Sequence, residues 1–241
     1  HVGILLVPAT PTETQWDMIG DTPMIREVEA NLRATGVKVL DIEILRVKPD
    51  TRAINWKPFF ETGARLGASQ VLVAGNDPDY NRFCDNFAEL CKIAHPYGLT
   101  LNVEPMPWCD IATVKATGDA MKRVNRPNAG VLVDPIHFFR ADNRYEDIDA
   151  LPPGSLHYCQ MCDITAERPK DMDGILYQAR NFRLSPGTGA ADLKTLLKHL
   201  PGLPISIEAC NAELALTLSP LDRARMYLED MVAVLNAAGE H

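Results

Sequence analysis

Residues 129–137 of the chain read AGVLVDPIH. The first five residues carry no polar side chain, so the stretch lacks the alternation that marks a strand with one solvated face. This pattern predicts a strand that is covered on both faces, as in a parallel β-sheet. The strand ends at Asp134, and His137 follows three residues later.

Similar apolar segments recur about 25–50 residues apart along the chain. They cover residues 3–7, 37–44, 70–75, 99–105, 129–135, 155–162 and 204–209. Amphipathic helical patterns fill several of the gaps, at residues 21–35, 79–95, 192–200 and from 219 onward. We expect Asp21 to cap the first of these helices and Ser219, in the sequence SPLD, to cap the last. This alternation of strand and helix is typical of βαβ units.

The seven predicted strands favour a barrel. A (β/α)8 barrel has eight strands and typically takes about 250 residues, and the chain has 241. Because the chain begins abruptly at a predicted strand, we expect the first barrel strand to lie upstream of residue 1. The prediction is therefore an α/β fold, with one TIM (β/α)8 barrel domain over residues 1–241. An open doubly wound sheet is the alternative, although no GxGxxG motif follows an early strand.

Composition and charge narrow the classes of partner. The formal net charge is −8, whereas general nucleic-acid binders usually carry basic surfaces. No segment approaches the roughly 20 apolar residues needed to span a bilayer, and no secretory signal is recognisable. The six cysteines are widely spaced and do not form the framework of a small secreted domain. We therefore expect a cytoplasmic protein with no nucleic-acid or membrane partner.

Acidic residues end five of the seven predicted strands, namely Glu43, Asp77, Glu104, Asp134 and Glu208. For any single strand, a helix cap or a solvated loop residue is the more common explanation. In a barrel, however, the carboxyl ends of the strands meet at one mouth, where chemistry takes place. Several carboxylates gathered there would repel one another unless a cation were present. A hard divalent cation such as Mg²⁺ or Mn²⁺ prefers oxygen ligands of this kind.

The segment LHYCQMCD, residues 156–163, contains a CxxC pair within a predicted strand. Because side chains alternate along a strand, Cys159 and Cys162 should point to opposite faces and cannot form a zinc knuckle. Gln160 lies between them near the end of the strand. Its amide oxygen is a neutral ligand for a metal ion, so Gln160 is the residue of interest in this segment.

Taken together, LNVEPMPW, GVLVDPIHFFR, HYCQMCD, RLSPGTG and ISIEAC resemble segments of the sugar phosphate isomerase/epimerase group, the xylose isomerase-like TIM barrels. The resemblance covers nearly the whole chain. It implies one divalent metal ion, often Mn²⁺ or Mg²⁺ with Zn²⁺ or Co²⁺ as alternatives, bound by Glu104, Asp134, Gln160 and Glu208. Successive ligands are 30, 26 and 48 residues apart. Many members carry His where this chain has Gln160, which is a weaker ligand.

The resemblance also implies a reaction. Related isomerases and epimerases move a proton next to a carbonyl of a small sugar, keto-sugar or sugar phosphate, with two metal-bound glutamates as acid and base. By analogy these are Glu104 and Glu208, while His137 holds a substrate hydroxyl or moves a proton. The other candidate substrate-binding residues, each with a purely structural alternative, are Arg140, Arg183, Trp108 and Glu43.

Other functions stay open from the sequence. A dehydratase of the dehydroshikimate or inosose type begins with the same proton removal, although Met106 stands where some of them carry His. An abasic-site endonuclease would need three zinc ions and more histidines than the six present, and a binding protein without turnover is the last alternative. The substrate, the identity of the metal and the oligomeric state are open, a homodimer being one option.

Overall fold

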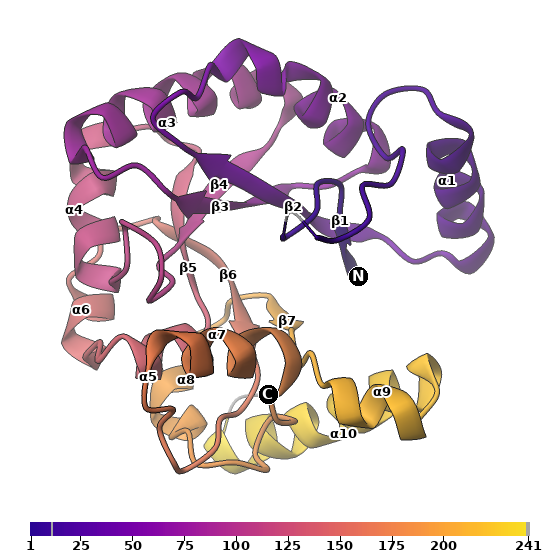
Figure 1. Ribbon diagram of the computed structural model, residues 1–241, viewed down its shortest axis with the longest axis vertical. Helices are drawn as coiled ribbons and strands as arrows, with labels where there is room; N and C mark the ends of the chain where they lie inside the picture. Colours follow the sequence, from indigo (N-terminus) through magenta and orange to yellow (C-terminus); the bar gives the residue numbers. More distant parts are fainter. Residues whose placement is uncertain (11, 240–241) are drawn as a thin grey trace. The chain divides into compact units, whose positions relative to one another are not determined.

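A computed structural model describes residues 1–10 and 12–239. In this part of the chain, seven strands form one sheet in the order β1-β2-β3-β4-β5-β6-β7 (Figure 1). Each overlaps one predicted segment: β1 (Val2–Leu5), β2 (Val39–Val47), β3 (Gln70–Gly75), β4 (Thr100–Glu104), β5 (Ala129–Val133), β6 (Leu156–Met161) and β7 (Ile205–Ile207). The strand pairs from β1 to β5, and the pair β6 and β7, are parallel. The seven predicted strands are thus confirmed.

Helices fill the connections between the strands. They are α1 (Pro23–Thr35), α2 (Lys57–Leu66), α3 (Tyr80–Ala94), α4 (Val114–Val124), α5 (Pro135–Arg140), α6 (Tyr145–Asp149), α7 (Met172–Asn181), α8 (Leu193–Lys198), α9 (Ala212–Thr217) and α10 (Pro220–Ala238). Two short 3-10 helices, η1 (Ala53–Trp56) and η2 (His95–Tyr97), precede α2 and β4. No helix in the described residues combines the length and hydropathy needed to cross a membrane.

The caps of the first and last helices test the sequence predictions. Ser219 caps α10 as predicted, with its side chain accepting from the Asp222 amide. The prediction for α1 was wrong by one residue, because Thr22 rather than Asp21 accepts from the Ile25 amide. Pro23 occupies the first helical position, which makes the preceding residue the cap. The Asp21 carboxylate is instead bound by Arg65.

The chain contains two compact units. Unit 1 comprises residues 1–104, 109–111 and 119–131, and unit 2 comprises residues 105–108, 112–118 and 132–241. In unit 1, Val47 pairs with Gly75 and Ala74 pairs with Glu104. The carboxyl ends of β2, β3 and β4 therefore lie level with one another. Helix α2 packs closely on β2 at Gly63, where an added Cβ would lie 2.3 Å from an Ile42 methyl.

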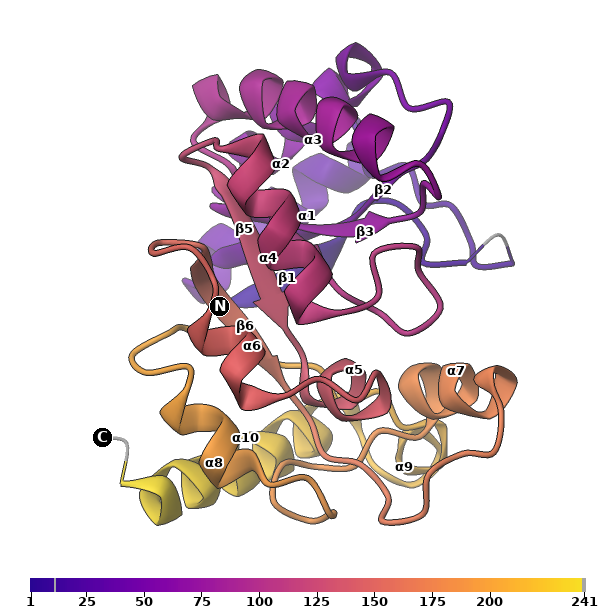
Figure 2. The same ribbon diagram turned by 90° about the vertical axis from the view of Figure 1, so that its left-hand side faces the viewer.

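Unit 2 has its own buried cluster, formed by Ile136, Cys162, Ile164, Ala179 and Ala209. Strands β6 and β7 pair so that Gln160 lies opposite Ser206. Helix α10 lies against α8, as the two views show (Figures 1 and 2). The prediction of a single domain over residues 1–241 stays a prediction.

Candidate metal and catalytic site

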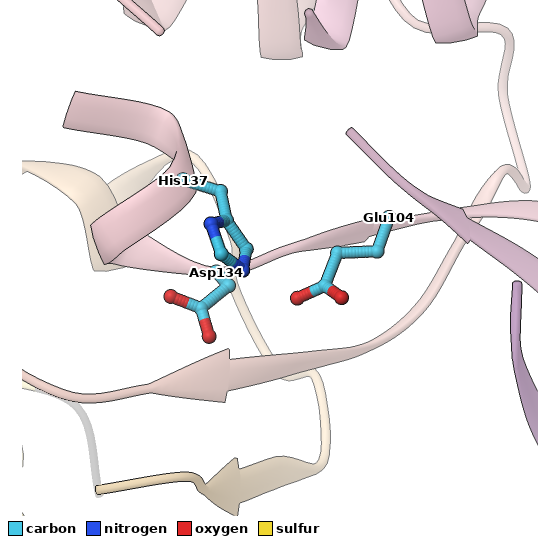
Figure 3. A group of neighbouring side chains, drawn as sticks. All are labelled: Glu104, Asp134 and His137. Carbon is cyan, nitrogen blue, oxygen red and sulfur yellow. The ribbon is translucent and has the colours of Figure 1, made fainter. Parts of the chain in front are cut away.

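Three predicted site residues lie together. Ligand atoms of Glu104, Asp134 and His137 are all within 4.8 Å of one another, and the three residues are buried (Figure 3). The pairing of β4 with β5 explains why two of them meet, because Val103 lies opposite Val131 and the acids follow shortly after on each strand. In Figure 3 the Glu104 carboxylate points toward the side where Asp134 and His137 lie.

Asp134 has a structural role besides any chemical one. Its Oδ1 accepts from the Ile136 amide at 2.8 Å and so caps α5. Proline at the first helical position and the cap at Asp134 fix the first turn of α5. His137 is in that turn, which places its ring near the end of β5. Asp134 can therefore be both a helix cap and a metal ligand.

His137 is held in its neutral form. Its side chain is only 2% exposed, and burial lowers its pKa to about 3, against the opposing effect of the Asp134 charge. The Trp108 ring lies edge-on to the imidazole, with 5.0 Å between ring centroids. At neutral pH the ring thus offers a nitrogen lone pair, suited to a metal ion or to a hydrogen bond from a hydroxyl.

Arg183, a predicted substrate-binding residue, contacts two of the predicted metal ligands, Asp134 and Glu208. Its Nη1 is 2.5 Å from Asp134 Oδ2 and 3.1 Å from Glu208 Oε2, and it also donates to the Glu208 carbonyl at 3.0 Å. Its Nε donates to the Ala179 carbonyl at 2.7 Å. Burial alone would raise the pKa of Asp134, but the Arg183 charge holds that pKa below its ordinary value. One guanidinium therefore joins two carboxylates from different strands.

Gln160 has a buried side-chain oxygen that is not used in a hydrogen bond within the described residues, as expected of a metal ligand. Its side chain is 1% exposed, and its Oε1 has no hydrogen-bond partner among the described residues. Leaving a buried amide oxygen without a partner costs roughly 1–3 kcal/mol. The cysteines beside it are free thiols with different partners, Cys162 Sγ contacting Asp134 Oδ1 at 3.6 Å and Cys159 Sγ the Pro204 carbonyl at 3.8 Å.

These residues fit a divalent metal ion. Carboxylate and amide oxygens with one neutral imidazole are ligands that Mg²⁺ and Mn²⁺ accept, and Zn²⁺ accepts them too. The Gln160 oxygen has no hydrogen-bond partner among the described residues, and Asp134 Oδ1 accepts from the Ile136 amide and, weakly, from Cys162 Sγ. The Arg183 guanidinium already binds Asp134 and Glu208, so a metal ion would share these acids with it.

The remaining predicted substrate residues are engaged in local structure. Arg140 is buried, and its Nε and Nη2 donate to Gln178 Oε1 and to the Thr165 carbonyl, both at 2.8 Å. Trp108 packs against the buried cluster of unit 2. Glu43 shares a strand face with Asp41, since both carboxylates lie over Gly3 of β1. Roles in substrate binding for these residues stay predictions.

The SPGTG turn, residues 185–189, has an internal partner that the sequence did not reveal. The buried Asp163 carboxylate accepts from the amides of Gly187, Gly189 and Ala191 at 2.9–3.0 Å, and from its neighbour Ile164 at 2.8 Å. The amides that an external anion would use therefore bind an acid of the chain itself. The one available signal was the Asp that follows the β6 segment.

Residues 5–233 match the family described as Xylose isomerase-like TIM barrel. The chain belongs to this family. The predicted TIM-barrel fold is thereby confirmed, and solved structures agree. A structure described as the IolI protein with a bound zinc atom is similar with a TM-score of 0.73 and 21% identity, over 90% of this chain and 83% of that chain. D-allulose 3-epimerase from Methylomonas sp. in complex with D-allulose gives a TM-score of 0.60 and 16% identity, over 83% and 70%.

Curated relatives are similar over part of their length. The 3-dehydroshikimate dehydratase of Pseudomonas aeruginosa is 27% identical over 164 residues, which is 63% of this chain and 25% of that protein. The inosose isomerase of Bacillus licheniformis is 32% identical over 120 residues, or 49% of this chain and 41% of that protein. The matches thus span less than half the length of these relatives.

Proposed function

We propose that the chain is a divalent-metal-dependent isomerase or epimerase, which transfers a proton next to a carbonyl of a small sugar, keto-sugar or sugar phosphate. The observation that carries the proposal is the buried group of Glu104, Asp134 and His137, whose ligand atoms lie within 4.8 Å. The likeness to an inosose isomerase and to D-allulose 3-epimerase supports this class of substrate. The likeness to a 3-dehydroshikimate dehydratase supports the same first step, removal of a proton next to a carbonyl, but a dehydratase then eliminates water.

The charges around Arg183 are compatible with a divalent ion. Asp134 and Glu208 share the one positive charge of Arg183, and His137 is neutral, because burial lowers its pKa to about 3. A divalent cation bound by these acids would offset the repulsion between their carboxylates.

The proposed roles follow from the chemistry of the side chains. When bound, a metal ion would polarise the substrate carbonyl and acidify the neighbouring C–H bond. Glu104 removes the proton from that carbon, and its burial keeps bulk water from the reaction. Glu208 returns a proton, and the contact of its Oε2 with Arg183 at 3.1 Å orients the carboxylate. The neutral ring of His137 accepts a hydrogen bond from a substrate hydroxyl.

Proton–deuterium exchange tests the proposal. The protein, loaded with Mn²⁺ in D₂O, is incubated with a panel of keto-sugars and cyclic ketones, and proton NMR follows the carbon next to each carbonyl. We expect deuterium at that carbon of at least one compound, without loss of water. Loss of water with formation of an unsaturated ketone would identify a dehydratase instead. A panel without exchange would contradict the proposed activity and favour a binding protein.

The variant Glu208→Gln tests the assignment of the second glutamate. We expect exchange to fall by at least 100-fold, because general acid–base catalysis contributes about 10²–10⁴-fold. Circular dichroism should show an unchanged fold. Glu213→Gln, at an exposed position of α9, is the matched control and should retain full exchange. Retained exchange in Glu208→Gln would remove this residue from the acid–base role.

A further inference from the structure

A cavity lies in unit 1, at the carboxyl ends of β1 and β2. Its volume is about 380 Å³, which is within the 300–1,000 Å³ typical of small-molecule sites. Three cationic side chains, those of Arg46, Lys48 and Arg52, line it together with one acidic side chain, that of Asp50. This local excess of positive charge contrasts with the net charge of −8 on the whole chain.

Two of the three cations are available to a ligand. Lys48 and Arg52 are exposed, and no ion pair involves either of them within residues 1–10 and 12–239. By contrast, Arg65 is bound by Glu29 and Asp21. Arg46 is half-buried, and its Nη2 donates to the Ala9 carbonyl at 2.5 Å. The cavity therefore combines one anchored guanidinium with two cations that form no ion pair with any acid of the described residues.

The cavity is also lined by an aromatic side chain, that of Trp56. Trp56 lines the cavity and is half-buried, and its ring lies edge-on to Phe59 with 5.4 Å between centroids. Ile44 and Val7 add apolar lining. Mostly apolar walls with a few placed charges are typical of sites for small organic ligands. The arrangement suits an anionic group attached to a compact carbon skeleton.

The cavity lies at the same edge of the sheet as Glu104. Val47 pairs with Gly75, and Ala74 pairs with Glu104. Lys48, the first residue after β2, therefore lies close to the level of Glu104 along the strand direction. Strand β2 is separated from β4 only by β3. Two strand spacings correspond to about 10 Å. One substrate can therefore reach from the cavity toward Glu104.

We infer that this cavity is an anion-binding subsite, which holds the phosphate or carboxylate group of the substrate through Arg46, Lys48 and Arg52. Guanidinium and ammonium groups are the usual ligands of such oxyanions. Arg140 and Arg183, which the sequence suggested for this task, are bound by groups of unit 2 instead. The inference rests on the proposed function for the reaction, but binding of the anion does not require turnover.

Calorimetric titration of the full chain with glucose 6-phosphate, glucuronate and glucose tests the subsite. EDTA is present, so that no phosphate binds through a metal ion. We expect glucose 6-phosphate or glucuronate, or both, to bind at least tenfold more tightly than glucose, and the stronger of the two identifies the anion. Raising the salt concentration should weaken this binding, because the cations are exposed.

Variants assign the binding to the cavity. The double variant Lys48→Ala/Arg52→Ala should raise the Kd of the charged sugar at least tenfold, while Arg126→Ala, which removes an exposed charge elsewhere in unit 1, should not change it. Equal binding of glucose and both charged sugars, no binding of the charged sugars, or equal losses in the two variants would overturn the inference. Failed exchange with intact anion binding would contradict the proposed function and leave the subsite standing.

Discussion

Two strand-end acids, Asp77 after β3 and Asp134 after β5, both pair with arginine but in different ways. Arg82 lies five residues after Asp77 and binds both of its oxygens, at 2.6 and 2.8 Å, with a side chain that is 44% exposed. Arg183 lies 49 residues after Asp134 and is 5% exposed, and it also binds Glu208. The Asp77–Arg82 pair stabilises one short segment of the chain. Arg183 instead connects two segments that are far apart in the sequence, those of Asp134 and Glu208.

The difference shows why an acid at the end of a strand does not reveal its function by itself. The sequences VAGND and VLVD end in the same residue type after similar strands. The Asp77 side chain is buried, but its partner Arg82 is 44% exposed, so solvent screens this pair, which we expect to be worth about 1 kcal/mol or less, as surface pairs are. Asp134 is in a buried network, where removing one member leaves charge uncompensated. Burial of the arginine partner, and its distance from the acid along the chain, therefore separate the structural acid from the candidate ligand.

Replacing Arg183 should have the largest effect. Arg183→Met leaves Asp134 and Glu208 without their shared cation, so we expect the free energy of unfolding to fall by about 3–5 kcal/mol in EDTA. Arg82→Met is the matched variant, which removes the exposed partner of Asp77, and it should lose about 1 kcal/mol or less. Urea denaturation of both variants and of the unchanged protein provides the comparison.

Added metal sharpens this test. Mn²⁺ should restore part of the stability of Arg183→Met, since a ligand that binds only the folded state stabilises it, while Arg82→Met should gain no more than the unchanged protein. If the free energy of unfolding fell equally in the two variants, burial of Arg183 would not make its ion pairs more important for stability than the pair of Arg82. A lack of recovery with Mn²⁺ would count against metal binding by these acids.

Asp163 offers a third kind of strand-end acid, one that binds backbone amides of a turn. Asp163→Asn replaces one acceptor oxygen by an NH₂ group, which cannot accept from Gly187 and Gly189. We expect a loss of about 2–3 kcal/mol, close to the cost of buried donors left without partners. Urea denaturation measures it, and the amides of the turn should exchange faster with D₂O. Asp110→Asn, at an exposed position, is the control and should change neither quantity.

Much of the fold could be predicted from the sequence, because its signals are local. The seven apolar segments and the caps of α10 depend on residues within a few positions of one another. The error at α1 was also local, since Pro23 moved the cap from Asp21 to Thr22. Parallel order then brings strand ends to one edge, which is why Glu104 and Asp134 could be expected to lie close together.

Side-chain partners across the chain could not be predicted in the same way. Nothing in RLSPGTG indicates that Arg183 turns back to Asp134, 49 residues earlier. The contacts of Asp163 with the turn and the cluster of Lys48 and Arg52 at one cavity also depend on how loops fold over strand ends. Sequence periodicity fixes which face of a strand a residue occupies, but loop conformation decides which distant group it meets.

Changing Gln160 tests whether the buried amide oxygen is a metal ligand. Gln160→His supplies an imidazole, a stronger ligand with a wider choice of metals, so we expect Zn²⁺ and Mn²⁺ to bind more tightly by roughly 10- to 100-fold, the range that changes around metal sites produce. Gln160→Leu keeps the side-chain volume and removes the oxygen, and it should weaken binding. Calorimetric titration with each metal measures both. Equal affinities in all three proteins would place Gln160 outside the metal site.

The smallest effect concerns the pair of the buried Asp77 with the exposed Arg82. The Arg82 guanidinium, which donates to the Asp77 carboxylate, holds the pKa of Asp77 below its ordinary value. A lowered folded-state pKa means that the pair stabilises the fold above the unfolded-state pKa of about 3.9, and that this stability is lost as the pH falls through the folded-state value.

Asp77→Asn should therefore lower the free energy of unfolding by about 1 kcal/mol or less at pH 7, because Arg82 is largely in contact with solvent. The difference from the unchanged protein should shrink as the pH falls below about 4. Urea denaturation at several pH values between 7 and 3 follows it. A difference that stays constant over this range would mean that Asp77 acts through its backbone hydrogen bond with Asp79, which Asn retains in part, and not through its charge.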